Sequence, residues 1–327
     1  MRTGINGLLI VDKPEGITSL TVVKEVKRRF RVKKAGHIGT LDPFATGVLP
    51  IVINEGTKLV PFLREEPKEY EAILKLGEET ATDDLTGEVL HRKKWEGITS
   101  GMIHSVFQKF QGKIQQIPPM FSAIKVQGKP LYQLARQGIE VDRKERKVEI
   151  FDIQVQETAL PQVCFKVSCS KGTYIRTLGR DIGRKLGCGA HLLRLRRIRS
   201  GSFTIKQAIP WKSLKDLPEA HDLSPWLISL GEALASLPEM IGDEHLVKMV
   251  RDGKGMSVRD LSPHTLPAFG KGEWLKMSSP EDGLVAILKS EVRDTDIRVA
   301  SPEVIALRAL RVFRPKRMVR EFQLPLA

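Results

Sequence analysis

The sequence has few of the residues and motifs that would point to a cofactor. Its three cysteines, Cys164, Cys169 and Cys188, have neither the C-x-x-C spacing of a zinc site nor the even number of a disulfide framework. The seven histidines form no H-E-x-x-H motif, and no G-x-x-x-x-G-K-[ST] phosphate loop or G-x-G-x-x-G fingerprint occurs. We therefore expect no metal, nucleotide or dinucleotide cofactor.

Long apolar runs are also missing. No stretch reaches the roughly 20 apolar residues that cross a bilayer, and the N-terminus lacks the regions of a signal peptide. We therefore expect a cytoplasmic, monomeric protein without a membrane partner. Positive charge, by contrast, is abundant: 53 Lys and Arg stand against 39 Asp and Glu, which gives a net charge of +14 over 327 residues. This balance favours a nucleic acid as the partner.

One segment places a lone carboxylate among glycine, threonine and proline: Gly36-His37-Ile38-Gly39-Thr40-Leu41-Asp42-Pro43, continuing through Ala45-Thr46-Gly47. Pro43 biases Asp42 towards an extended conformation, and the glycines allow another backbone or a ligand to come close. An isolated Asp-Pro pair is most often a turn. The whole segment, however, resembles the catalytic motif of the TruB-type tRNA pseudouridine-55 synthases, in which the aspartate matching Asp42 is the nucleophile.

Two more segments resemble the first motifs of that family. The string from Asp12 to Ser19 matches the opening motif and makes Lys13 a candidate substrate contact. Tyr70 begins a predicted strand, where a tyrosine usually packs its ring in the core. The resemblance implies instead that Tyr70 stacks on the target uracil. It also implies that His37 fills space in the folded T loop, although a lone histidine beside glycine is more often an ordinary loop residue.

The later motifs follow in the family's order. Within Gly172-Thr173-Tyr174-Ile175-Arg176, at the entry to a predicted helix, the resemblance implies that Tyr174 lines the uracil pocket and that Arg176 pairs with Asp42. An arginine at such a position is otherwise most often a surface residue. In the alternating basic strand Ala190 to Arg199, Leu195 matches a leucine that lines the pocket.

A basic, aromatic-containing stretch lies between predicted strands at about residues 117–147. Charge for phosphates and an aromatic face for a base are what an RNA-gripping loop needs, and Tyr132 supplies the face. In the family this region is a thumb that closes over the tRNA arm, whereas composition alone fits a surface helical hairpin equally well. We predict RNA backbone contacts here and in the basic C-terminal tail: Lys129, Arg136, Arg143, Arg314 and Arg317.

These patterns predict an α/β (α+β) protein with the pseudouridine synthase fold, that is, a mixed, mainly antiparallel sheet with flanking helices. We expect residues 1–236 to form the catalytic domain, with the inserted thumb. Short strand patterns after Leu237 are similar to the PUA domain, so we expect residues 237–327 to form a small PUA-like RNA-binding β-barrel with a basic tail.

The resemblance implies isomerisation of the T-loop uridine of tRNA after it is flipped out of its stack. Asp42 would attack either C1′ of the ribose or C6 of the uracil, and the residues do not decide between the two. We expect the positive charge of Arg176 to keep Asp42 ionised in a site that excludes water. Two alternatives stay open: a guide-RNA-dependent synthase of the dyskerin type, and a non-catalytic protein that binds or folds tRNA.

Overall fold

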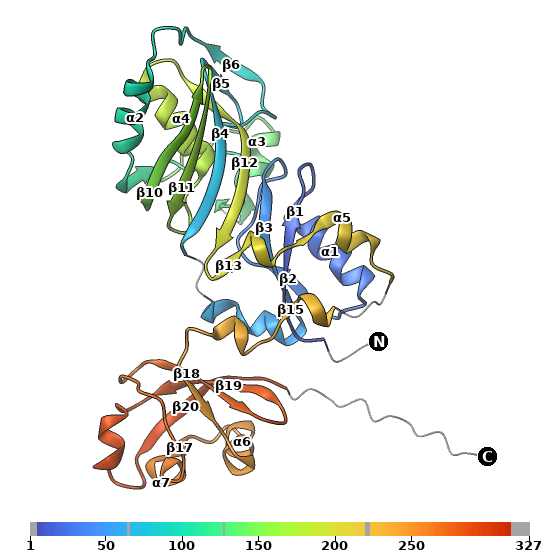
Figure 1. Cartoon of the computed structure of the whole chain (residues 1–327), viewed down its shortest axis with the longest axis vertical. Coiled ribbons are helices and arrows are strands. Elements are labelled where there is room, and N and C mark those ends of the chain that lie inside the picture. The colour runs from blue at the N-terminus through green and yellow to red at the C-terminus, as the bar shows by residue number, and fades with distance from the viewer. Residues whose placement is uncertain (1–4, 64–65, 127, 220–222, 315–327) are drawn as a thin grey trace, which may run out of the picture.

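The computed structural model describes residues 5–63, 66–126, 128–219 and 223–314 (Figure 1). Within these residues an eleven-stranded sheet carries the N-terminal two thirds of the chain, and a five-stranded sheet carries the C-terminal part. None of the helices described in these ranges is both long and apolar enough to cross a membrane.

The large sheet is mixed, as predicted. Its strands lie in the order β14 (Ile209–Pro210), β1 (Gly7–Lys13), β3 (Thr46–Ile53), β12 (Ala190–Ser200), β4 (Lys68–Leu76), β11 (Gln162–Cys169), β10 (Arg146–Ala159) and β7 (Gly112–Gln116). Three short strands pair beside this path: β2 (Ala35–His37) with β3, β13 (Phe203–Thr204) with β12, and β15 (Leu227–Ile228) with β1. All pairs are antiparallel except β1 with β14 and β3 with β12.

Helices cover the sheet because each has an apolar face at helical spacing. Helix α1 (Ser19–Arg29) begins at the N-cap Thr18, whose side chain accepts from the backbone N–H of Thr21, and buries Val22, Val23 and Val26. Helices α2 (Ser100–Gln108) and α4 (Ile175–Leu186) contact each other at one side of the sheet (Figure 1). Shorter helical segments of this part include η1 (Asn54–Phe62), η2 (Ile205–Gln207), α5 (Trp211–Asp216), η3 (Ser224–Trp226) and η4 (Glu232–Leu234).

A close crossing joins the two halves of this sheet. Strands β3 and β12 run parallel and pair at Thr46 with Arg196 and at Gly47 with Arg197. Gly47 has a φ of +104°, and a Cβ atom there would lie 2.1 Å from the carbonyl oxygen of Arg197. Since no side chain fits so close to a backbone, the crossing requires glycine.

Two segments of the chain protrude from the large sheet. Residues 117–145 depart after β7 and return as its neighbour β10, so they form an insertion, with the hairpin β8 (Lys125–Val126) and β9 (Lys129–Pro130) followed by α3 (Leu131–Arg136). The acidic loop after β4 lies within a second hairpin, made by β5 (Glu78–Thr80) and β6 (Val89–Arg92). The predicted limits of the thumb, about 117–147, stay a prediction.

The five-stranded sheet has the order β16 (Glu239–Ile241), β18 (Trp274–Ser279), β19 (Gly283–Ser290), β20 (Ile305–Val312) and β17 (Met256–Ser257). Its other elements are α6 (Glu244–Arg251), α7 (Val258–Leu261) and η5 (Thr295–Arg298). It curls into half of a barrel around its own apolar cluster, in agreement with the PUA-like fold that we predicted. The boundary at residue 236 remains a prediction.

The C-terminal sheet packs against the rest of the protein. The rings of Phe62 and Trp274 meet edge to face with centroids 5.1 Å apart. The ammonium of Lys58 donates to the carbonyl oxygen of Val312 over 2.9 Å, and the backbone N–H of Arg314 donates to Glu55 over 2.9 Å. Aromatic, charged and backbone groups thus all cross this seam.

Candidate active site

Asp42 and Arg176 meet at the centre of the candidate site. Asp42 lies in the loop between β2 and β3, and Arg176 lies in the first turn of α4. The Nε of Arg176 donates to Oδ2 of Asp42 over 2.8 Å. The side chain of Arg176 is 3% exposed whereas that of Asp42 is 35% exposed, so the carboxylate is held from the protein side and is open on the other. Charge-assisted bonds of this kind are among the stronger hydrogen bonds in proteins.

The other nitrogens of Arg176 bind two different segments. One donates to the carbonyl oxygen of Thr82 over 2.7 Å and the other to that of Phe121 over 2.8 Å. Nε also lies 3.7 Å from a carboxylate oxygen of Asp84. Arg176 therefore ties the Asp42 loop to the β5–β6 hairpin and to the base of the insertion. The other oxygen of Asp84 accepts from the hydroxyls of Thr82 and Thr86.

Lys13 supports the loop from beneath. It is fully buried, and its ammonium donates to the carbonyl oxygens of Pro14, Ile17 and Pro43 over 2.7, 2.8 and 3.1 Å. Burial lowers its pKa to about 8, against the opposing influence of Asp42. An ammonium has three N–H groups, and all three are occupied here. In this structure Lys13 fastens the residue after Asp42, and the substrate contact that we predicted for it stays a prediction.

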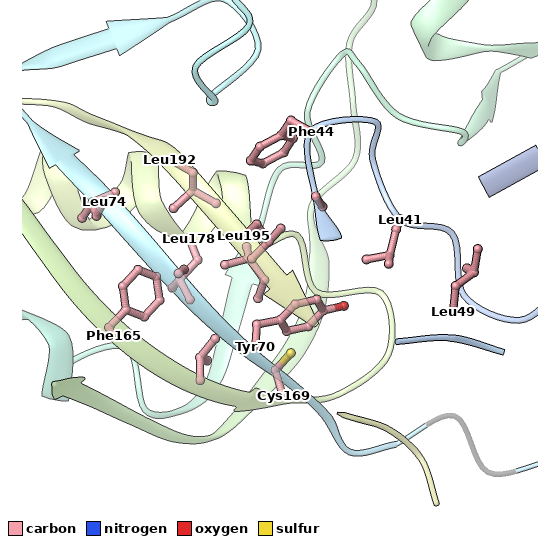
Figure 2. Packing of buried hydrophobic residues seen from close by; sticks show 14 of the residues in the cluster. Leu41, Phe44, Leu49, Tyr70, Leu74, Phe165, Cys169, Leu178, Leu192 and Leu195 are labelled. Carbon is pink, nitrogen blue, oxygen red and sulfur yellow. The ribbon is translucent and has the colours of Figure 1, made fainter. Parts of the chain in front are cut away.

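Tyr70 and Leu195 lie beside each other on strands β4 and β12 and face the same core (Figure 2). Tyr70 is 7% exposed, and its hydroxyl points from β4 towards the segment that carries Leu41 (Figure 2). Burial raises the pKa of this hydroxyl to about 12, although the nearby positive charge of Arg197 opposes the shift. The hydroxyl of Tyr70 is therefore neutral at physiological pH.

Tyr174 and His37 complete the predicted set. Tyr174 is the N-cap of α4, and burial raises the pKa of its hydroxyl, with the Asp42 charge acting in the same direction, so the two side chains are close enough to interact. His37 is partly buried on β2, and its Nδ1 has no hydrogen-bond partner within the described parts of the chain. Burial and the charge of Arg197 lower its pKa, so this imidazole is neutral at pH 7.

The five predicted phosphate contacts differ in their surroundings. Lys129 and Arg136 are exposed on the insertion, and the guanidinium of Arg136 lies over the ring of Tyr132 at 5.8 Å. Arg143 is different: it is partly buried and donates to the carbonyl oxygen of Pro118 over 3.1 Å, so it braces the insertion internally. Arg314 is exposed beside the seam, and Arg317 lies outside the described residues.

Several residues of the site escaped the sequence analysis. Thr82 and Phe121 act through backbone carbonyls, for which a sequence carries no signal. Asp84 looked like any residue of a polar loop. The inward position of Arg197 could have been predicted from the sequence. Arg197 lies two residues after the buried Leu195 on β12, and side chains two positions apart along a strand face the same side. Among the described residues, no cluster of His, Cys, Asp and Glu side chains is arranged to hold a metal ion.

The chain matches two models of one protein family. Residues 27–175 match the N-terminal domain of the TruB family pseudouridylate synthases, and residues 176–235 match the C-terminal domain of tRNA pseudouridylate synthase B. The tRNA pseudouridine synthase B of Geobacter sulfurreducens is 44% identical over 309 residues, which are 94% of this chain and 100% of that protein. The chain belongs to the TruB family of pseudouridylate synthases. The family predicted from the sequence is thereby confirmed.

Further TruB relatives and solved structures agree with this assignment. The tRNA pseudouridine synthase B of Geotalea uraniireducens is 54% identical over 237 residues, which are 72% of this chain and 76% of that protein. A chain of a Cbf5-Nop10-Gar1 complex has a similar fold, with a TM-score of 0.68, 29% identity, and coverage of 95% of this chain and 85% of that one. A chain of an H/ACA RNP bound to a substrate RNA also has a similar fold. Its TM-score is 0.68 and its identity 27%, and the match covers 95% of this chain and 86% of that one. The predicted pseudouridine synthase fold is confirmed.

Proposed function

We propose that this member of the TruB family isomerises the T-loop uridine of tRNA, at position 55, with Asp42 as its nucleophile. The observation that carries the proposal is the Asp42–Arg176 pair. The carboxylate of Asp42 is partly exposed, and Arg176, which binds it, is almost fully buried. The arginine fixes the direction of the carboxylate through a charge-assisted hydrogen bond, while the open side leaves room for a flipped-out nucleotide.

The reaction needs no oxidant and no second substrate. Attack of the Asp42 carboxylate at C1′ of the ribose or at C6 of the uracil leads to cleavage of the bond between C1′ and N1. The base then turns, C5 bonds to C1′, and the bond between Asp42 and the substrate breaks, which restores the carboxylate. The proton on C5 is lost and N1 gains a proton. In this proposal Tyr70 stacks on the base, and Tyr174 and Leu195 line its pocket. His37 takes the space that the base leaves in the T loop.

The enzyme acts on tRNA without a cofactor and as a monomer in the cytoplasm, in this proposal. The exposed Lys129 and Arg136 contact the RNA backbone, together with Arg314 and Arg317 of the tail. Phosphate contacts of this kind supply affinity and register, whereas the loop around Asp42 supplies the chemistry. Lys13 supports that loop through its bond to the carbonyl oxygen of Pro43.

The test is an Asp42→Asn protein assayed on a bare T-arm hairpin without any guide RNA. We expect the unaltered protein to form pseudouridine and the variant to lose about 10⁴-fold or more in single-turnover rate, as expected when a nucleophile is removed. Binding of the hairpin should persist, because one carboxylate does not dominate an interface built on many phosphates. Asp252→Asn, an exposed carboxylate after α6, is the matched control.

The same assay separates the alternatives. Equal loss of binding and turnover in Asp42→Asn would give Asp42 a structural role, and a variant that still forms pseudouridine would leave it as a turn residue of an RNA-binding protein. A guide-RNA-dependent activity is the second candidate, because the fold resembles a chain of the Cbf5-Nop10-Gar1 complex over 95% of its length. Activity on the hairpin alone excludes that candidate.

A further inference from the structure

Arg197 is a cation in the core of the sheet, directly behind the Asp42 loop. Its side chain is 0% exposed, and on β12 it pairs with Gly47 of β3 on one side and with Tyr70 of β4 on the other. Its Nε donates to the carbonyl oxygen of Val48 over 2.7 Å, and its Nη2 donates to that of Gly39 over 2.8 Å. One guanidinium therefore binds both ends of the loop that carries Asp42.

This placement is costly. Removing a cation from water costs several kcal/mol, and a carboxylate usually offsets that cost. No carboxylate forms an ion pair with Arg197 in the part of the chain that the structure describes. By contrast, its neighbours Arg196 and Arg199, with more exposed side chains, pair with Asp12 and Glu69. An apolar residue would fill this core position at less cost if filling were the whole task.

The third nitrogen of Arg197 indicates what the task is. Nη1 is buried and, among the residues that the structure describes, has no hydrogen-bond partner. Tyr70 stands directly opposite Arg197 in the pairing of β4 with β12, and the positive charge of the guanidinium acts to lower the pKa of the Tyr70 hydroxyl, against the larger raising effect of burial. Figure 2 shows the same hydroxyl pointing away from β4, towards the loop segment that carries Leu41. The unpartnered nitrogen and the Tyr70 hydroxyl thus belong to residues that pair across neighbouring strands beside the Asp42 loop.

We propose that Arg197 is a positioning residue for pseudouridine formation, which holds the Asp42 loop through Gly39 and orients the hydroxyl of Tyr70 through Nη1. The inference rests on the proposed roles of Asp42 and Tyr70. When a guanidinium N–H donates to a phenol oxygen, the phenol's own proton must point elsewhere, here towards the bound base. The positive charge also stabilises negative charge that develops on that oxygen during a proton transfer at C5.

Substitution by lysine tests this role, because lysine keeps the positive charge but lacks the planar set of N–H donors of a guanidinium. The ammonium of Arg197→Lys cannot reach the carbonyl oxygens of Val48 and Gly39 and the hydroxyl of Tyr70 from one planar group. We expect the variant to bind the T-arm hairpin with unchanged affinity and to lose roughly 10² in single-turnover rate, in the range of one lost proton-transfer contribution. Arg199→Lys on the same strand, whose side chain is 41% exposed, should change neither quantity.

A double-mutant cycle with Tyr70→Phe decides how Arg197 acts. If Arg197 works through the Tyr70 hydroxyl, most of the loss caused by Arg197→Lys disappears in the Tyr70→Phe background, to about threefold or less. If Arg197 only stabilises the fold, the same factor appears in both backgrounds, and the proposal is overturned. Thermal unfolding of each variant identifies those that do not fold.

Two further measurements keep the outcome clear. If Arg197→Lys does not fold, Arg197→Gln, which keeps N–H donors without charge, goes through the same cycle. A Tyr70→Phe protein with the unaltered single-turnover rate overturns the proposal by itself. Asp42→Asn is measured in parallel: its retained activity would refute the proposed function, whereas equal factors in the cycle refute the role of Arg197 alone.

Discussion

The side chain of Arg176 binds Asp42 over 2.8 Å although 134 positions of the chain separate the two residues. The same guanidinium binds the carbonyl oxygen of Phe121, at the base of the insertion, over 2.8 Å. The proposed nucleophile and the region predicted to grip the RNA therefore share one buried group. A shift of the insertion must change the bonds of the arginine that directs Asp42.

Arg176→Lys should damage catalysis more than binding. The ammonium cannot bond Asp42 and the carbonyl oxygens of Thr82 and Phe121 in one plane, so the carboxylate loses its fixed direction. We expect the single-turnover rate to fall roughly 10²-fold or more. The free energy of unfolding should fall by about 1–3 kcal/mol, because buried carbonyl groups lose a donor.

Quench-flow with saturating enzyme and urea unfolding measure these two quantities. The control is Arg184→Lys on the same helix, whose side chain is 57% exposed and pairs with Glu79. An Arg176→Lys protein with the unaltered rate would show that the ion pair does not direct the nucleophile.

Substitutions of Tyr70 separate its ring from its hydroxyl. Tyr70→Phe keeps the face that stacks on a base, so hairpin binding should persist while the single-turnover rate falls by about 10²-fold, as for a lost proton-transfer group. Tyr70→Leu should lose both, with stacking worth roughly 1–3 kcal/mol of binding. Fluorescence titration of labelled hairpin gives the affinity. Tight binding by the leucine variant would rule out a stacking role.

Asp83 should make stability depend on pH. Burial raises the pKa of its carboxyl to about 6 in the folded protein, against the opposing charge of Arg180, whereas the ordinary value is 3.8. The folded state therefore holds this proton more tightly than the unfolded state. The stabilisation that results is fully present below pH 3.8 and is lost as the pH rises through about 6.

Asp83→Asn removes this dependence. Relative to the variant, the unaltered protein should lose about 2 kcal/mol of unfolding free energy between pH 4 and pH 7. Urea unfolding of both proteins across that range checks the difference. A difference that stays constant with pH, or one that grows in the opposite direction, would contradict the raised pKa of Asp83.

The exposed and the partly buried basic residues of the insertion should affect RNA binding differently when they are replaced. Lys129→Ala and Arg136→Ala should each weaken binding to the T arm and to a scrambled hairpin alike, and flatten the slope of log K against log salt by somewhat under one unit. Arg143→Ala should leave the salt slope unchanged, because this side chain is turned inward to the carbonyl oxygen of Pro118. Its effect should appear as a lower single-turnover rate. A reduced salt slope for the Arg143→Ala protein would contradict this prediction and would indicate that Arg143 contacts a phosphate.

The sequence allowed much of the fold to be predicted because the signals were local. Alternation along β12 and helical spacing in α1 and α2 reported which faces are buried, and the motif residues Asp42, Tyr70, Tyr174 and Arg176 do gather in one place. The surroundings of two residues could not be predicted, for a common reason. Lys13 and Arg143 have the composition of RNA contacts, but their cationic groups bond to backbone carbonyls of their own chain. The tertiary placement of a long side chain decides between these fates, and no local pattern encodes it.

The close crossing at Gly47 lies at a narrow junction in the large sheet, between β3 and β12. Strands β1 and β3 pair over seven positions, and β4 and β12 over nine, but β3 and β12 meet at two. Backbone pairing thus divides the sheet into two extensively paired parts with a narrow junction between them, and the loop of Asp42 adjoins that junction. We expect a bend between the two parts to disturb fewer backbone hydrogen bonds than a bend within either part. Such a bend would move Asp42 relative to Tyr70.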